Sequence, residues 1–209
     1  MVMIRAACAD DAAAIAAIRA QSWRAAYDGI IPADILARAT GPRSVALHSE
    51  AIRRERWTGM IVAEVADEAA APAAAAPAPC GAQAEGSSLA EDDVRASLAV
   101  AFASYGPERG ADGQPGPAPG SGRGQATAEL YAIYAAPARW ATGAGRALMD
   151  AVLGRARAAG YARISLWVLE DNSRARRFYE RAGFSPTDGR QALEDLGGVT
   201  EVRYERPLP

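Results

Sequence analysis

The sequence contains no lysine, and all 23 of its basic residues are arginine. A Walker-type phosphate loop requires a Gly-Lys pair and Schiff-base catalysis requires a lysine amine, so both are excluded. The net charge is −2 at pH 7 and the pI is about 5.6. The chain therefore has no bulk positive charge to attract nucleic acid, and we expect no nucleic-acid partner.

Cysteine is also scarce. Cys8 and Cys80 are the only two in the sequence, and neither has partners at metal-ligand spacing. They cannot form a disulfide framework or a metal cluster, so we expect no metal site. No apolar run reaches about 18 residues, and the opening MVMIRAACADD has no apolar leader segment. We therefore expect a cytoplasmic protein with no membrane partner.

Two segments have almost no large apolar residues. Residues 66–93 contain a single one, Leu89, and in residues 106–126 Gly or Pro occupies 11 of 21 positions. Neither segment can bury enough surface to offset its ordering entropy, so we interpret both as disordered low-complexity insertions. The remaining residues suit one domain, and we expect 1–209 to form a single domain that contains both insertions.

The rest of the chain alternates between helix-like and strand-like patterns. The order of these patterns predicts a mixed α/β (α+β) domain rather than a strict βαβ repeat. The expected helices span residues 11–27, 32–38, 44–57, 145–159 and 173–182. The expected strands span residues 3–7, 60–65, 94–105, 129–135, 163–169, 184–187 and 199–206.

The run RWATGAGRALM, residues 139–149, places two glycines where a helix begins. A dinucleotide fingerprint needs a third glycine, but Leu148 stands at that position and seven residues separate the turn from the preceding strand. Two interpretations remain open. The glycines relieve strain at a helix start, or successive backbone N–H groups bind a pyrophosphate at the positive end of the helix. The residues of this candidate anion site are Ala141, Thr142, Gly143, Ala144, Gly145 and Arg146.

A second motif follows about thirty residues later, where Asn172 and Tyr179 are seven positions apart and share one helix face. The chain also contains ELYAIYAAP before the glycines, a closing Glu201-x-x-Tyr204, and an N-terminal Trp-x-x-x-Tyr-x-Gly-Ile-x-Pro. Taken together, these motifs resemble the GNAT superfamily of acyl-CoA N-acyltransferases. The resemblance covers the compact domain but neither insertion. It departs at Trp140, where the family signature usually has Gln or Arg.

The resemblance implies the GNAT fold, in which helices flank a central, mostly antiparallel sheet that splays between its fourth and fifth strands. It also implies acetyl-CoA as the co-substrate, with the pantetheine arm paired to the backbone of the strand before the glycines. An amide near Ala135 would polarise the thioester carbonyl. By resemblance, Ile133, Tyr134, Ala135 and Asn172 join the glycine turn in binding the cofactor, although Asn172 also suits a helix cap.

The resemblance assigns Tyr179 as the phenol that protonates the leaving thiolate, and core packing is the alternative. Glu129 is the candidate to take the proton of the amine, or else a solvated carboxylate at a strand end. Tyr131 and Tyr134 are three apart on one strand, so we expect them to face opposite sides. Trp23 and Tyr27, with Tyr131, are candidates to line the acceptor pocket.

The expected function is transfer of the acetyl group of acetyl-CoA to an amine, by direct attack in a ternary complex and without a metal. The acceptor is expected to be a small molecule or a peptide amine, and the sequence is compatible with a homodimer. The alternative is a catalytically degenerate GNAT domain that binds acyl-CoA as a sensor or partner module.

Overall fold

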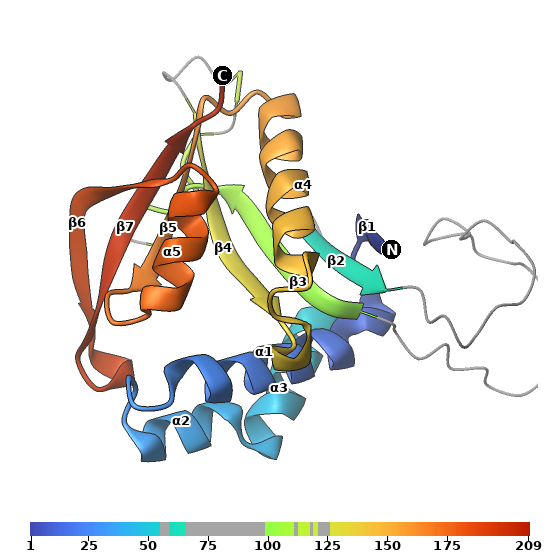
Figure 1. Cartoon of the computed structure of the whole chain (residues 1–209), viewed down its shortest axis with the longest axis vertical. Helices are drawn as coiled ribbons and strands as arrows, with labels where there is room; N and C mark the ends of the chain where they lie inside the picture. The colour runs from blue at the N-terminus through green and yellow to red at the C-terminus, as the bar shows by residue number, and fades with distance from the viewer. Residues whose placement is uncertain (55–58, 66–98, 111–112, 118, 121–125) are drawn as a thin grey trace, which may run out of the picture.

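A computed structural model describes residues 1–54, 59–65, 99–110, 113–117, 119–120 and 126–209. The predicted insertion at residues 66–93 lies outside these ranges. Within them, the strands form one sheet in the order β1-β2-β3-β4-β5-β7-β6 (Figure 1). None of the described helices has the length and apolarity that a membrane crossing requires.

The elements follow the expected order along the chain. The strands are β1 (Val2–Ala6), β2 (Met60–Val65), β3 (Ala99–Pro107), β4 (Thr127–Ala135), β5 (Arg163–Leu169), β6 (Ser185–Leu193) and β7 (Val199–Pro207). The α-helices are α1 (Ala12–Tyr27), α2 (Ala33–Thr40), α3 (Pro42–Arg54), α4 (Ala144–Ala158) and α5 (Ser173–Arg181). Short 3₁₀ turns are η1 (Ala9–Asp11), η2 (Pro137–Arg139) and η3 (Glu194–Leu196).

The sheet parts between β4 and β5, which are its only parallel neighbours among the described strands. Their pairing begins at Thr127 with Arg163 and ends at Leu130 with Leu166. Beyond that point β4 pairs with β3 alone and β5 pairs with β7 alone. Figure 1 shows the two ribbons diverging toward their lower ends. The predicted mostly antiparallel sheet, splayed between its fourth and fifth strands, is confirmed.

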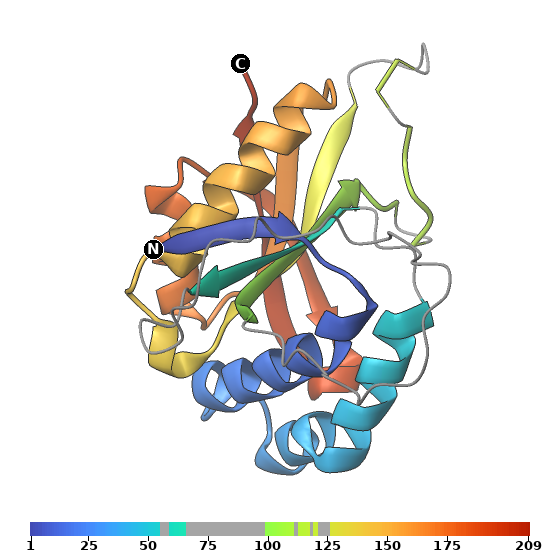
Figure 2. The same ribbon diagram turned by 90° about the vertical axis from the view of Figure 1, so that its right-hand side faces the viewer.

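Helices pack against both faces of the sheet. On β2, Ile61 belongs to the core that includes α4, whereas the adjacent Val62 belongs to the core that includes α1. Leu148 and Val152 of α4 are fully buried, as the helical periodicity predicts. Figure 2 shows α4 lying along one side of the strands and α1, α2 and α3 grouped at the lower end of the view.

A register shift interrupts the alternation of side chains along β4. Leu130 and Ile133 both pack in the core that includes α4, although they are three residues apart. The pairing of β4 with β3 skips Tyr131, which is the extra residue of a β-bulge. The bulge places Tyr131 and Tyr134 on the same face, away from α4. The expectation that they face opposite sides is therefore wrong, because it assumed an uninterrupted period of two.

The start of the second predicted insertion is part of the folded domain. β3 continues to Pro107, and the next residue, Glu108, accepts a hydrogen bond of 2.9 Å from Ser165 Oγ. Arg109 then forms an ion pair with Glu129. The boundary predicted at residue 106 is too early. Glu108 and Arg109 are held by polar contacts, and the prediction counted only apolar side chains.

Tyr204 attaches α5 to β7. Its ring is fully buried, and its hydroxyl donates to Glu180 Oε1 and accepts from Arg176 Nε, each at 3.0 Å. Arg176 also donates to the carbonyl oxygen of Glu170, which lies between β5 and α5. The tyrosine of the closing motif thus fixes the helix on which Tyr179 lies.

We expect Tyr204→Phe to lower the free energy of unfolding by about 1–2 kcal/mol, because the change removes both hydrogen bonds of the hydroxyl. Urea denaturation measures this difference. The control is Arg163→Gln, which breaks an exposed ion pair with Glu205 and should cost less than about 0.5 kcal/mol. Equal effects of the two changes would contradict the anchoring role of Tyr204.

Candidate active site

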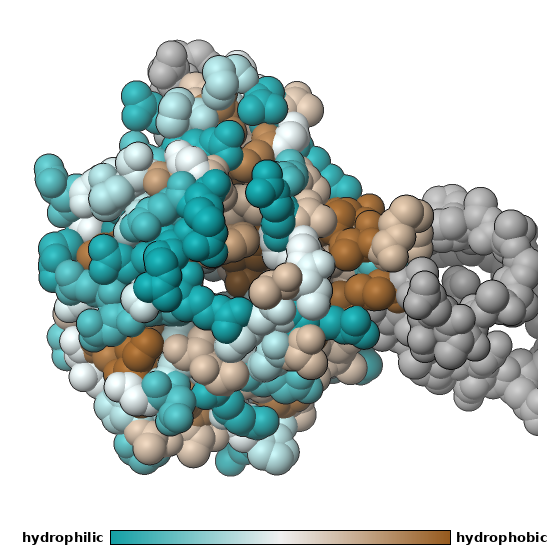
Figure 3. Space-filling model, viewed as in Figure 1, coloured by the Kyte–Doolittle hydropathy of each residue, from teal (hydrophilic) through white to brown (hydrophobic). Residues whose placement is uncertain are grey.

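A cavity of about 1250 Å³ opens where β4 and β5 part. Its walls come from α1, β4, the loop before α4, β5, α5 and β7. Figure 3 shows this hollow with hydrophobic residues at its floor and hydrophilic residues around its rim. Most of the predicted site residues line it: Trp23, Tyr27, Glu129, Tyr131, Ile133, Tyr134, Ala135, Ala141, Gly143, Gly145, Arg146, Asn172 and Tyr179.

The glycine turn before α4 has an unusual backbone conformation. Gly143 precedes α4 with φ of 97°, and a Cβ built there would meet nothing within 4 Å. Ala141 also has a positive φ, of 62°, which is uncommon for a residue with a Cβ. The backbone thus enters the left-handed region twice just before α4, and turns with left-handed residues form the concave N–H arrangements that bind anions in other proteins. The first N–H groups of α4 add to these, because a helix gives them no internal partner.

Two of the predicted cofactor residues, Thr142 and Ala144, do not line the cavity. The Thr142 hydroxyl donates to the carbonyl oxygen of Arg139 at 2.8 Å, and the Ala144 methyl is fully buried in the core under α4. The side chains of these two residues are therefore not available to a ligand in the cavity.

Trp140, the residue at which the chain departs from the family signature, is fixed by two contacts. Its Nε1 donates to the carbonyl oxygen of Ala135 at 2.9 Å, and the Arg174 guanidinium carbon lies 3.6 Å from the ring centroid. This cation–π contact brings a positive charge from α5 to the loop before α4. The sequence analysis missed Arg174, because Trp140 and Arg174 are adjacent only in the folded chain.

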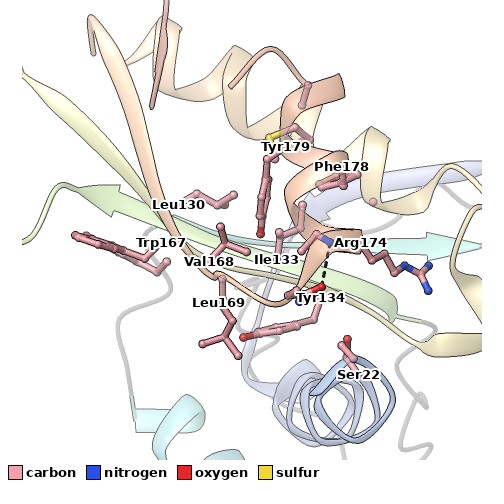
Figure 4. A pocket seen from close by; sticks show the side chains of 18 of the residues that line it. Ser22, Leu130, Ile133, Tyr134, Trp167, Val168, Leu169, Arg174, Phe178 and Tyr179 are labelled. Carbon is pink, nitrogen blue, oxygen red and sulfur yellow. Dashed lines mark hydrogen bonds between the residues drawn. The ribbon is translucent and has the colours of Figure 1, made fainter. Parts of the chain in front are cut away.

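Tyr179 packs in the core and also lines the cavity, so the general-acid role stays a compatible prediction. Its ring packs edge-on between Phe178 and Phe184, with centroids 5.4 and 6.0 Å away. Its hydroxyl points from α5 toward Ile133 and Val168, into the gap between β4 and β5 (Figure 4). Burial is the main cause that raises the pKa of Tyr179 above its ordinary value, so the hydroxyl keeps its proton at neutral pH.

Asn172 caps α5, as one of its two interpretations proposed. Its Oδ1 accepts a hydrogen bond of 3.0 Å from the N–H of Ala175, and the residue is buried. It also lines the cavity, so contact with a cofactor stays a compatible prediction.

Glu129 is not a solvated carboxylate, because only 3% of its surface is exposed. It accepts hydrogen bonds from Arg109 through the backbone N–H at 2.9 Å, Nε at 3.2 Å and Nη2 at 2.5 Å. The same guanidinium lies 4.3 Å from the ring centroid of Tyr131, whose hydroxyl donates to the carbonyl oxygen of Pro107. Both oxygens of Glu129 are thus engaged by one cation at the edge of the cavity.

Trp23 and Tyr27 form the wall that α1 contributes. Their rings meet edge-on with centroids 5.2 Å apart, and both line the cavity. Burial is the main cause that raises the pKa of Tyr27, and the nearby phenol of Tyr134 on β4 raises it further. Trp23 Nε1 is buried without a hydrogen-bond partner among the described residues.

Glu201 of β7 also lines the cavity, and the sequence analysis gave it no role beyond membership of the closing motif. Gln191 Nε2 donates to its Oε1 at 2.5 Å. Burial is the main cause that raises the pKa of Glu201, and the nearby charge of Glu129 raises it further. In the ranges that the structure describes, no three His, Cys, Asp or Glu side chains gather as a metal-binding group.

Known proteins resemble this chain in sequence and in fold. The acetyltransferase (GNAT) family profile matches residues 49–184. A mycothiol acetyltransferase of Beutenbergia cavernae is 44% identical over 61 residues, which are 29% of this chain and only 20% of that protein. The PaiA N-acetyltransferase of Thermoplasma acidophilum, solved with coenzyme A, superposes with a TM-score of 0.59 at 16% identity and 99% coverage of both chains. YncA of Salmonella typhimurium, solved with acetyl-CoA, gives 0.59 at 18% identity, covering 100% of this chain and 94% of that one.

The two glycines of the turn should respond differently to alanine. Gly143→Ala should lower the free energy of unfolding by about 1 kcal/mol, because its φ of 97° is unfavourable for a residue with a Cβ. Gly145→Ala should cost nothing or stabilise, since its Cβ would lie 3.7 Å from the Phe178 ring in a helix. Chemical denaturation compares them, and a larger loss for Gly145→Ala would refute this reading of the turn.

Proposed function

The chain belongs to the acetyltransferase (GNAT) family, and from this premise we propose that it transfers the acetyl group of acetyl-CoA to an amine in a ternary complex. One observation carries the proposal: the gap between β4 and β5 has the glycine turn on one side and the Tyr179 hydroxyl inside it. A donor with a pyrophosphate and a thioester fits this arrangement of N–H groups and acid. The partial match to a mycothiol acetyltransferase supports acetyl transfer without identifying the acceptor.

The donor would bind along the unpaired edge of β4. The N–H groups around Gly143 would bind the pyrophosphate, and Arg174 would add a positive charge beside them. The pantetheine amides would pair with the β4 backbone beyond Leu130, where β5 no longer occupies the edge. The coenzyme A in PaiA and the acetyl-CoA in YncA support this mode, because those proteins share the fold.

The chemistry requires positioning and two proton movements. The neutral amine attacks the thioester carbonyl carbon, a C–N bond forms, and the C–S bond breaks with its electron pair going to sulfur. A backbone N–H near Ala135 would stabilise the developing oxyanion. Tyr179 would give its proton to the sulfur and regain one that the nitrogen releases, so that coenzyme A leaves as the thiol.

The donor site is tested by calorimetric titration with acetyl-CoA, coenzyme A and ATP. We expect both coenzyme A species to bind with micromolar affinity and ATP not to bind. Arg174→Ala should weaken coenzyme A binding by roughly tenfold, because it removes a charge-assisted contact to phosphate. The control is Arg177→Ala, an exposed arginine of the same helix outside the cavity. No binding of coenzyme A to the unaltered protein would overturn the proposed function.

Tyr179→Phe should lower kcat by roughly 10²–10⁴-fold while coenzyme A binding stays unchanged, because a positioned general acid contributes about that factor. Its raised pKa means that the proton-bearing form persists as pH rises beyond tyrosine's ordinary 10.0. The kcat of the unaltered enzyme should therefore not fall between pH 8 and pH ~9.5 through this group. Thiol release, followed spectroscopically across this range, measures both effects.

Tyr161→Phe is the matched control, since this tyrosine is as buried as Tyr179 but lies outside the cavity. An unchanged kcat for Tyr179→Phe would refute the general-acid role. Binding of acetyl-CoA with no turnover on any amine would instead favour the sensor alternative.

A further inference from the structure

Glu201 is a carboxylate of the acceptor side that the proposed reaction leaves without a role. It pairs across the sheet with Leu169 of β5 and Gln191 of β6. Along β7, Val202 and Tyr204 point to one face of the sheet, because both lie in the core that includes α4 and the α5 residue Tyr179. The Glu201 side chain therefore lies on the opposite face of the sheet, where the cavity opens toward α1.

The charge of Glu201 is not neutralised as that of Glu129 is. Arg109 engages both oxygens of Glu129, whereas the partner of Glu201 is the neutral amide of Gln191. Within the described residues, no arginine lies at ion-pair distance from Glu201. Half-burial is the main cause that raises the pKa of Glu201, and the charge of Glu129 adds to it, while the hydrogen bond from Gln191 and the charge of Arg109 partly offset the rise. The raised pKa makes this carboxylate a stronger proton acceptor than an ordinary glutamate.

The surroundings of Glu201 suit the organic part of a cation. Leu169 lies directly across from it, and Trp167 is two residues earlier on the same face of β5. Both line the cavity (Figure 4). The apolar part of an amine can pack on these two side chains while its ammonium group contacts the Glu201 carboxylate. The indole ring of Trp167 also attracts a nearby cation.

We propose that Glu201 binds the ammonium group of the acceptor and accepts the proton that the nitrogen must lose before it attacks. This inference rests on the proposed function and moves the proton-accepting role from Glu129 to Glu201. The step balances: one N–H bond of the ammonium breaks, its electron pair stays on nitrogen, and the proton bonds to Glu201 and then leaves to solvent. The acceptor is then a primary amine that is cationic at neutral pH.

The assignment also restricts what stands next to the amine. Two carboxylates, Glu201 and Glu129, line the cavity, and among the described residues only Glu129 of these two has an arginine partner. An acceptor with a carboxylate beside its amine would place a second negative charge without an arginine partner beside Glu201, which is unfavourable in a half-buried site. The acceptor class is therefore an alkylamine or an amine beside a neutral group, rather than a free α-amino acid.

The test is a calorimetric titration of the coenzyme A-loaded protein at pH 7.5 with phenethylamine and with its neutral isostere 2-phenylethanol. The unaltered protein should bind the ammonium at least roughly tenfold more tightly than the alcohol, because hydrogen bonds to charged groups are the stronger ones. Glu201→Gln should remove this preference. The amide keeps the shape and can still accept the bond from Gln191, so the fold should be retained.

Glu205→Gln is the matched control, because Glu205 lies on the same strand and is paired with Arg203. It should keep the preference for the ammonium. A preference that is absent from the unaltered protein, that survives Glu201→Gln, or that is removed by Glu129→Gln instead, would overturn the assignment. Coenzyme A binding is measured first in the same experiment, and its failure would overturn the proposed function rather than the role of Glu201.

Discussion

The parting of β4 from β5 is the constraint on which the rest of the site depends. A backbone edge inside a domain normally pairs, because an unpaired buried N–H or C=O group costs free energy. Here the parallel pairing ends at Leu130 and Leu166, and two edges diverge around a cavity. The edges remain apart because each strand is held on its other side, β4 by β3 and β5 by β7. Tyr204 then fixes α5 above the gap, with Tyr179 directed into it.

Because the chain has no lysine, arginine provides its long basic side chains, and several contacts in the structure depend on the planar guanidinium group. Arg109 binds both oxygens of Glu129 and covers the ring of Tyr131. Arg174 stacks on Trp140, and Arg176 joins a phenol to a backbone carbonyl. A compact ammonium can neither stack in this way nor bind two oxygens in a fixed fork, so lysine would not replace these residues.

The elements and the motif residues could be predicted from sequence because their signals are local. Apolar periodicity located α4 and β5 to within about a residue, and the glycine turn indicated where a helix begins. The bulge in β4 was not predictable, since it depends on pairing with β3 rather than on the strand's own residues. The contacts of Arg109 and Arg174 were missed for a similar reason, because each joins residues 20 or more positions apart in the sequence. Arg109 lies in a polar, glycine- and proline-rich segment and Arg174 in a run of arginines, so both were expected to be exposed to solvent. β6 runs to Leu193, well beyond the expected 187, because its pairing with β7 sustains a polar strand.

The ion pair of Arg109 with Glu129 has a consequence for how the length of the neighbouring segment can change in evolution. Arg109 stands where the folded β3 passes into a segment rich in glycine and proline, and the pair fixes that junction to β4. The entropic cost of closing a loop rises by only about 0.6 kcal/mol for each doubling of its length. The loop-closure cost of a change in the length of this segment is therefore small. Because the junction is fixed, changes of length in that segment should leave β4, and with it one wall of the cavity, in place.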